Sequence, residues 1–270
     1  MDTTTTEEWA QRLFDAFDSR TPLEPLTATH PDLSVAEAYA IAEAIRRLRT
    51  ARGEMVAGWK IGFTNRTIWD DYGVHAPIWG PMFNSTTGPA SAGEWDVGRL
   101  HEPQIEAEIA FRFARTPEPG LEENELLGCI DAVSHSLEFV QSPFPGWKFA
   151  PVDTMAAAGL HGGFAHGPWH AIEADNRDDW LQALSDFTIT IRSDTGIIDS
   201  GVAANVLGGP LSALRHFVDE AARQTPECII RPGDAVTTGT VPKAFPVTPG
   251  EHWSTEVEGL PLEGLSVRCV

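Results

Sequence analysis

The stretch QIEAEIAFRF, residues 104–113, alternates apolar and polar side chains over most of its length. This alternation predicts a β-strand, because successive side chains of a strand point to opposite faces of the sheet. One face of the strand would be apolar, and the other would carry Glu106 and Glu108. Their Cα atoms would lie about 6–7 Å apart. Two glutamates on one face of a strand raise the question of what balances their charge.

A second stretch, VSHSLEFV at residues 133–140, shows the same alternation and places Glu138 on its polar face. Three carboxylates that converge on one point repel one another unless they are protonated or bind a cation. A set of oxygen ligands favours a hard cation such as Mg²⁺ or Mn²⁺. The alternative is that Glu106 and Glu108 lie on a solvated face of the sheet, which is common for an isolated Glu-x-Glu pair.

The order of the expected elements indicates an α+β fold with a mixed or rolled sheet. Ser34 and Glu37 have the spacing of a capping box at the start of the second helix. We expect residues 1–55 to form an N-terminal helical layer and residues 56–270 a catalytic mixed-β domain, the two making one continuous unit. Helices are expected at 5–18, at 34–50 and from Pro210 onward, and strands at 55–63, 104–113, 133–140, 187–193, 196–201, 234–240, 252–259 and 265–270.

The composition narrows the class of partners. The chain has 270 residues, a net charge of −20 and a pI of about 4.7, so it would repel nucleic acid. Its three cysteines, Cys129, Cys228 and Cys269, lie far apart, which indicates a reducing compartment rather than a disulfide framework. The first residues do not read as a signal peptide, and no apolar run is long enough to span a membrane. We expect a cytoplasmic protein with no membrane partner.

Seven segments in a fixed order carry a more specific signal. They are GWKIGFT (58–64), YGVHAPIWG (72–80), PQIEAEIAF (103–111), SLEFV (136–140), VDTMAAAG (152–159), VLGGPLSAL (206–214) and IRPGDAVTTGT (230–240). From about residue 35 to residue 270, this set resembles the 2-keto-4-pentenoate hydratase / 4-oxalocrotonate decarboxylase family, within the fumarylacetoacetate hydrolase superfamily.

The resemblance implies a fumarylacetoacetate hydrolase-like roll and a metal centre. Glu106, Glu108 and Glu138 match the family's ligands for Mg²⁺ or Mn²⁺, and Lys60 matches its active-site lysine. The implied protein is a homo-oligomeric, metal-dependent hydratase of a 2-hydroxydienoate or 2-oxo-enoate, in which the metal chelates the 2-oxo acid and stabilises a dienolate. Decarboxylation of a vinylogous 2-oxo diacid, C–C bond hydrolysis, tautomerisation, and metal binding without turnover are the alternatives.

Lys60 is expected to shuttle a proton or to pair with the substrate carboxylate. Its apolar neighbours Trp59 and Ile61 would lower its pKa and ease proton transfer. The alternative is a surface lysine whose amine reaches solvent.

The chain departs from the family pattern at two positions. Ile78 stands where the family carries an acidic residue for acid–base work, and Gly159 lies in the run where it tends to carry a serine. His161 could take over proton transfer, since histidine titrates near neutral pH. The predicted substrate-binding residues, suited to a bulky apolar substrate tail, are Trp59, Ile78, Trp79, Gly159 and Leu207.

Overall fold

The computed structural model describes residues 1, 3–66, 69, 73–224 and 230–270. Its helices are α1 (Thr3–Ser19), α2 (Val35–Ala51), α4 (Glu123–Leu127), α5 (Pro151–Ala156), α6 (Arg177–Ala183) and α7 (Pro210–Gln224), with the 3-10 turn η5 (Ala158–Leu160) directly after α5. Its strands are β1 (Val56–Gly62), β2 (Ile78–Phe83), β3 (Thr87–Pro89), β4 (Glu94–Trp95), β5 (Gln104–Phe113), β6 (Ile130–Val140), β7 (His161–His166), β8 (His170–Ala171), β9 (Thr188–Ser193), β10 (Ile198–Val202), β11 (Ala235–Thr237), β12 (Phe245–Pro246), β13 (His252–Glu258) and β14 (Ser266–Cys269). Two helices come first and strands follow, as predicted for an α+β fold.

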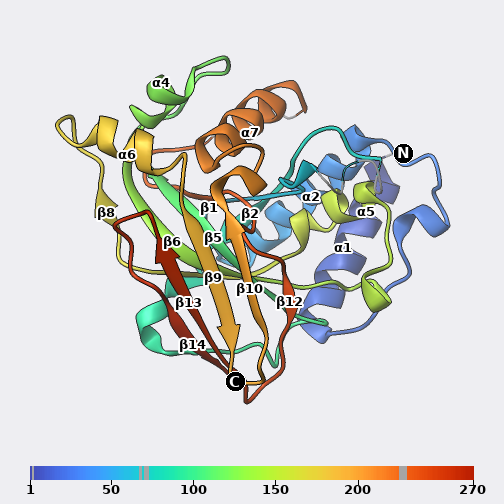
Figure 1. Ribbon diagram of the computed structural model, residues 1–270. Helices are drawn as coiled ribbons and strands as arrows, with labels where there is room; N and C mark the ends of the chain where they lie inside the picture. The colour runs from blue at the N-terminus through green and yellow to red at the C-terminus, as the bar shows by residue number, and fades with distance from the viewer. Residues whose placement is uncertain (2, 67–68, 70–72, 225–229) are drawn as a thin grey trace.

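The strands form two mixed sheets. The first has the order β2-β1-β11-β5-β6-β7-β3, with β12 beside β5 and β8 beside β6, and the second has the order β10-β9-β13-β14-β4. The pairs β1–β11, β3–β7 and β4–β14 are parallel, whereas the other pairs are antiparallel. Strands β9 and β10, both expected from the sequence, form an antiparallel hairpin. Figure 1 shows β9, β10, β13 and β14 grouped on one side of the first sheet.

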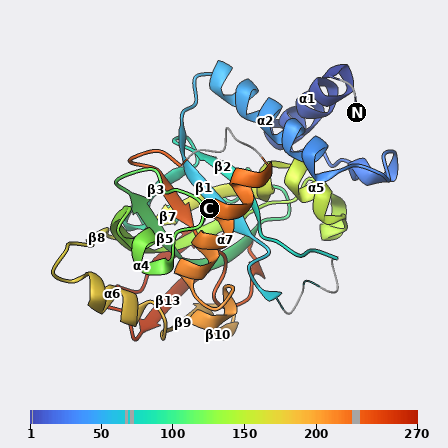
Figure 2. The ribbon, with the colours of Figure 1, turned by 90° about the horizontal axis from the view of Figure 1, so that it is seen from above.

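The N-terminal helices cover one flank of the sheets. Helix α2 begins at the predicted cap, where the Ser34 side chain accepts from the Glu37 amide and the Glu37 carboxylate accepts from the Ser34 amide. Helices α1, α2 and α5 lie side by side on this flank, and α7 packs against β1 (Figures 1 and 2). This arrangement confirms the predicted helical layer.

The register of β5 against β6 fixes the direction of the glutamates. Glu106 is paired with Glu138, and Glu108 with Ser136, so the three carboxylates share one face of the sheet, as predicted. The opposite face of β5 is fully buried and apolar, with Ile105, Ala107, Ile109 and Phe111. Glu108 and Glu138 are both 0% exposed, and Glu106 is half-buried, so this face of the sheet is not an ordinary solvated one.

One hydrophobic cluster contains side chains from the helical layer and from both sheets, such as Leu13, Ile41, Phe111 and Trp253. We therefore keep the proposal that residues 1–55 and 56–270 form one structural unit. Among the described helices, none is both long enough and apolar enough to cross a membrane. Cys129 and Cys269 are buried and free, and Cys228 lies outside the described residues.

Candidate active site

Three glutamates from two neighbouring strands meet at one point. Carboxylate oxygens of Glu106, Glu108 and Glu138 all lie within 4.8 Å of one another. Strand pairing produces this convergence, because Glu106 and Glu138 are direct partners and Glu108 is two residues along the same face. The predicted set of ligands is therefore brought together, although the sequence separates Glu138 from the other two.

Within the described part of the chain, hydrogen bonds engage some of these carboxylate oxygens, and one buried oxygen has no hydrogen-bond partner. The Gly239 amide donates to Glu108 Oε2 at 2.8 Å, and Glu138 Oε1 lies 3.0 Å from Nδ1 of His161. Glu138 Oε2 accepts from the Thr237 hydroxyl at 3.4 Å. In contrast, Glu108 Oε1 is buried and has no hydrogen-bond partner in the described part of the chain. A buried, unpaired carboxylate oxygen is costly unless a cation or a proton satisfies it.

The raised pKa values of Glu106 and Glu108 also indicate a site for a cation. Burial, opposed by Lys60 and reinforced by Glu138, raises the pKa of Glu106 to about 7. Burial and the two neighbouring carboxylates raise the pKa of Glu108 well above its ordinary value. A bound divalent cation would relieve this repulsion, and carboxylate oxygens are the ligands that Mg²⁺ and Mn²⁺ prefer. The residues present therefore fit a hard divalent cation.

Lys60 reaches the same point from β1. It is 4% exposed, and its Nζ lies 3.5 Å from Glu138 Oε2, so it is not a surface lysine. Burial alone would lower the pKa of Lys60, but the charges of Glu138, Glu106 and Glu108 outweigh burial and raise the pKa. The prediction of a lowered pKa is thus wrong, because it considered the apolar neighbours in sequence and not the carboxylates across the sheet.

Two predicted substrate residues lie against Lys60. A Cβ atom on Gly159 would be 2.9 Å from Lys60 Cδ, and the glycine has φ of +69°, a left-handed conformation. A Cβ atom on Gly62, the strand partner of Ile78, would meet Ile78 Cγ1 at 3.2 Å and Lys60 Nζ at 3.6 Å. Gly159 thus leaves room for the lysine side chain, and Ile78 forms an apolar wall near its amine.

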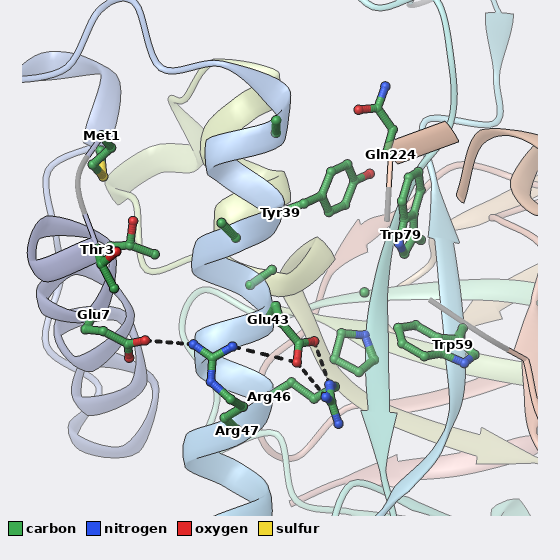
Figure 3. Close-up of a pocket in the computed structure, with 16 residues that line it drawn as sticks. Met1, Thr3, Glu7, Tyr39, Glu43, Arg46, Arg47, Trp59, Trp79 and Gln224 are labelled. Carbon is green, nitrogen blue, oxygen red and sulfur yellow. Dashed lines mark hydrogen bonds and ion pairs between the residues drawn. The ribbon is translucent and has the colours of Figure 1, made fainter. Parts of the chain in front are cut away.

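The two predicted tryptophans lie elsewhere. Trp59 and Trp79 each neighbour a residue that faces the glutamates, so the alternation of β1 and β2 turns both to the opposite face of the sheet. There Trp79 stacks on Tyr39 of α2 with ring centroids 4.1 Å apart. Both tryptophans line a separate pocket of about 640 Å³ beside the ion pairs of Glu43 with Arg46 and Arg47 (Figure 3). This placement corrects the expectation that they line the site of Lys60.

Of the two remaining predicted residues, His161 contacts a glutamate of the centre and Leu207 lies further away. His161 is the first residue of β7 and contacts Glu138 directly. Leu207 is buried with φ of +56°, and its amide donates to the carbonyl of Thr64, whose side chain contacts Gly239. Leu207 therefore lies behind the loop that holds Glu108, and its predicted contact with substrate stays a prediction.

Sequence reasoning missed several residues around the glutamates. Thr237 and Gly239 belong to the quoted segment 230–240 but received no role, and Thr86, which contacts His161 Nε2 at 3.0 Å, was not considered. A signal was present in the run TTGT at 237–240, since a glycine beside a buried strand often marks a close approach of backbone to a functional group. For Thr86 we find no such signal.

Comparisons with known proteins show the family of the chain. The family model described as Fumarylacetoacetate (FAA) hydrolase C-terminal matches residues 78–264. The chain is 30% identical over 258 residues to a 2-keto-4-pentenoate hydratase of Paraburkholderia xenovorans, covering 94% of this chain and 91% of that protein. It is 29% identical over 237 residues to a 4-oxalocrotonate decarboxylase of Pseudomonas sp. (strain CF600), covering 87% and 86%.

A solved structure has the same fold. The 4-oxalocrotonate decarboxylase from Pseudomonas putida G7, complexed with magnesium and adipate, superposes with a TM-score of 0.90 at 24% identity, covering 100% of this chain and 99% of that one. The fold and the buried cluster of glutamates define a fumarylacetoacetate hydrolase-type protein. More closely, the chain belongs to the 2-keto-4-pentenoate hydratase / 4-oxalocrotonate decarboxylase family, which confirms the resemblance seen in its motifs.

Proposed function

We propose that the chain is a divalent-metal-dependent lyase that hydrates a 2-hydroxydienoate through its 2-oxo-enoate form. The observation that carries the proposal is the buried Glu108 Oε1, which lacks a partner in the described chain and faces two further carboxylates. Glu106, Glu108 and Glu138 would hold Mg²⁺ or Mn²⁺. The cation would supply Lewis-acid stabilisation of negative charge on the oxygen of a 2-oxo acid.

The bonding of the carboxylates limits how the ligands are used. Glu108 keeps Oε2 on the Gly239 amide, so its Oε1 can bind a cation. Glu138 keeps Oε1 on His161, and its Oε2 makes only the longer contacts with Thr237 and Lys60, so a cation can bind there. Mg²⁺ prefers near-octahedral coordination and usually retains several non-protein ligands. Single-oxygen ligation by the glutamates would leave positions for the carboxylate and the 2-oxo group of a substrate, and for water.

Lys60 supplies the positive charge of this site. Burial would lower the pKa of Lys60, but the charges of Glu138, Glu106 and Glu108 raise it, which favours the protonated amine before a cation binds these carboxylates. A protonated amine can pair with the substrate carboxylate or donate a proton to the carbon chain. The side chain of Ile78, near this amine, has no ionisable group, and it would contact the apolar part of a substrate.

Decarboxylation is the second candidate. It is favoured by the similarity to the Pseudomonas 4-oxalocrotonate decarboxylase and by Ile78, since loss of CO₂ requires no residue to activate water. Both reactions pass through a dienolate of the same 2-oxo acid, so the same glutamates and lysine would serve either one.

The test is NMR in D₂O with Mg²⁺, using 2-hydroxypenta-2,4-dienoate and, separately, 2-oxohex-3-enedioate. The proteins compared are wild type, Glu108→Gln, and Glu256→Gln as a control. Glu256 is also a strand glutamate, but its side chain is 60% exposed and its ion-pair partner is Arg192 rather than a residue of the metal centre. A new 4-hydroxy-2-oxo acid supports hydration, and CO₂ release from the diacid supports decarboxylation.

The expected result is a loss of roughly 100-fold or more in turnover for Glu108→Gln and no change for Glu256→Gln. Metal-independent turnover, or equal rates for wild type and Glu108→Gln, would refute the metal-centred function. Deuterium exchange without either product would reduce the proposal to enolisation, that is, to the tautomerase alternative.

Assembly and location complete the proposal. The family resemblance supports a homo-oligomer that acts on a small 2-oxo acid, and the free, buried Cys129 and Cys269 are compatible with a reducing cytoplasm. Size-exclusion chromatography with light scattering tests the oligomer directly.

A further inference from the structure

We propose that His161 is a positioning residue, which together with Thr86 fixes the carboxylate of Glu138 so that only its Oε2 faces the metal centre. This inference rests on the proposed function and reassigns His161 from proton transfer to orientation of a ligand. It is drawn from the contacts of the imidazole ring, of the Thr86 hydroxyl and of the two oxygens of Glu138.

The two oxygens of Glu138 lie in different surroundings. Oε1 is 3.0 Å from His161 Nδ1, whereas Oε2 is 3.4 Å from the Thr237 hydroxyl and 3.5 Å from Lys60 Nζ. The shortest contact is with the histidine, and the longer ones surround the oxygen that faces Lys60. The carboxylate is therefore held at one oxygen and presented at the other.

The imidazole ring is fixed on its far side. His161 Nε2 lies 3.0 Å from Thr86 Oγ1, and Thr86 lies in the turn between β2 and β3. Its own amide donates to the Phe83 carbonyl, its carbonyl accepts from the Phe164 amide, and its hydroxyl accepts from the Phe83 amide at 3.2 Å. The threonine is therefore anchored by backbone bonds to two strands, β2 and β7.

The contact with Glu138 indicates which nitrogen of His161 carries the proton. A ring nitrogen beside a carboxylate must carry its proton, so Nδ1 donates to Glu138. In the neutral ring, Nε2 is then an acceptor, and the single proton of the Thr86 hydroxyl can point to it or to the Phe83 carbonyl oxygen, each 3.0 Å away. Carboxylates that bind metal ions are commonly oriented by a hydrogen bond from a neighbouring group, and His161 gives Glu138 such a bond.

The same contacts argue against proton transfer to substrate. The side chain of His161 is 2% exposed, and both ring nitrogens are engaged by groups of the protein. A general acid must come within hydrogen-bond distance of the substrate proton, directly or through one water. To do so, His161 would have to give up Glu138 or Thr86.

Binding of Mn²⁺ alone, measured by titration calorimetry, tests the inference without relying on turnover. We expect His161→Ala to weaken Mn²⁺ binding by roughly 10- to 100-fold, the usual cost of losing the partner of a ligand. His161→Asn places an amide N–H near the position of Nδ1 but cannot relay a proton. It should bind Mn²⁺ within about threefold of wild type and retain most of the turnover number.

Thr86 provides an independent variant outside the ligand set. Thr86→Val removes the hydroxyl at nearly constant shape and should weaken Mn²⁺ binding, whereas Thr86→Ser should restore it. His101→Ala is the matched control. His101 is also buried, but its Nε2 bonds the Ala16 carbonyl, so its loss should lower thermal stability and leave Mn²⁺ affinity unchanged.

Three results would overturn the inference. Unchanged Mn²⁺ affinity in both His161→Ala and Thr86→Val would show that neither residue orients Glu138. His161→Asn that binds Mn²⁺ normally but loses turnover by about 100-fold or more would make His161 a proton-transfer group after all. Wild type that binds no Mn²⁺ would overturn both this inference and the proposed function, whereas the first two results leave the proposed function intact.

Discussion

Replacing Gly159 with alanine tests whether the position of the Lys60 side chain controls turnover. The added Cβ atom would lie 2.9 Å from Lys60 Cδ, 3.1 Å from the Gly80 nitrogen and 3.3 Å from the Trp79 carbonyl carbon. The last two atoms belong to the backbone of β2, which is paired with β1 and cannot easily yield. Lys60 must therefore move.

The size of the effect follows from ordinary contact distances. Carbon atoms in contact are separated by about 3.5–4.0 Å, so Lys60 Cδ has to shift by roughly 0.6–1 Å. A displacement of about 1 Å of a catalytic group can reduce turnover by about 100-fold. We therefore expect Gly159→Ala to lose on the order of 100-fold in kcat while Mn²⁺ affinity, which depends on the glutamates, changes little.

A matched control separates this contact from backbone strain. Gly93 has φ of +77°, close to the +69° of Gly159, but a Cβ atom there would meet nothing within 4 Å. The left-handed conformation alone should cost about 1–2 kcal/mol in each variant, and the close contacts add to this cost in Gly159→Ala only. Each substitution would lower Tm by a few degrees, about 2–4 °C per kcal/mol in a chain of this size.

The assay is turnover of the preferred substrate together with thermal unfolding of both variants. If Gly159→Ala and Gly93→Ala keep the same kcat, the geometry of Lys60 does not limit the reaction, and the role assigned to its amine is wrong. A loss of kcat confined to Gly159→Ala supports that role, since the two variants share the same strain.

Three further predictions concern stability. Ser34→Ala removes the cap of α2 and should lower the free energy of unfolding by about 1 kcal/mol in chemical denaturation. Burial lowers the pKa of His135 from 6.5 to about 4, so the unfolded chain takes up this proton at a higher pH than the folded chain. The free energy of unfolding should therefore fall by up to about 3 kcal/mol as the pH drops through this range. Measurements of unfolding against pH should lack this component in His135→Gln. Mg²⁺ at about 100 times its Kd should stabilise wild type by about 2.7 kcal/mol, an effect that chelation by EDTA reverses and that thermal unfolding of Glu108→Gln should not show.

Local sequence was sufficient for features that depend on neighbours along the chain. The capping box of α2 needs only Ser34 and Glu37, and both its hydrogen bonds are present. The alternation in 104–113 placed Glu106 and Glu108 on one face because the period of a strand is two residues. The same rule, applied to 58–62, would have separated Trp59 from Lys60, so that error lay in the reasoning and not in the sequence.

Features that join distant segments depended on the tertiary structure. Pairing of β5 with β6 brings Glu138 opposite Glu106, and the combined field of the glutamates reverses the expected pKa shift of Lys60. No local pattern encodes such a shift, since it depends on distances across a buried sheet.

The class of fold, the three glutamates of the metal centre and the family could therefore be predicted from the sequence, because periodicity and ordered motifs are properties of the sequence. The contacts of the individual oxygens of Glu108 and Glu138, and the room that Gly159 leaves for Lys60, are visible only in the folded structure. It also placed His161 between Glu138 and Thr86. These contacts join residues far apart in the chain, and burial removes the water that would otherwise screen their charges.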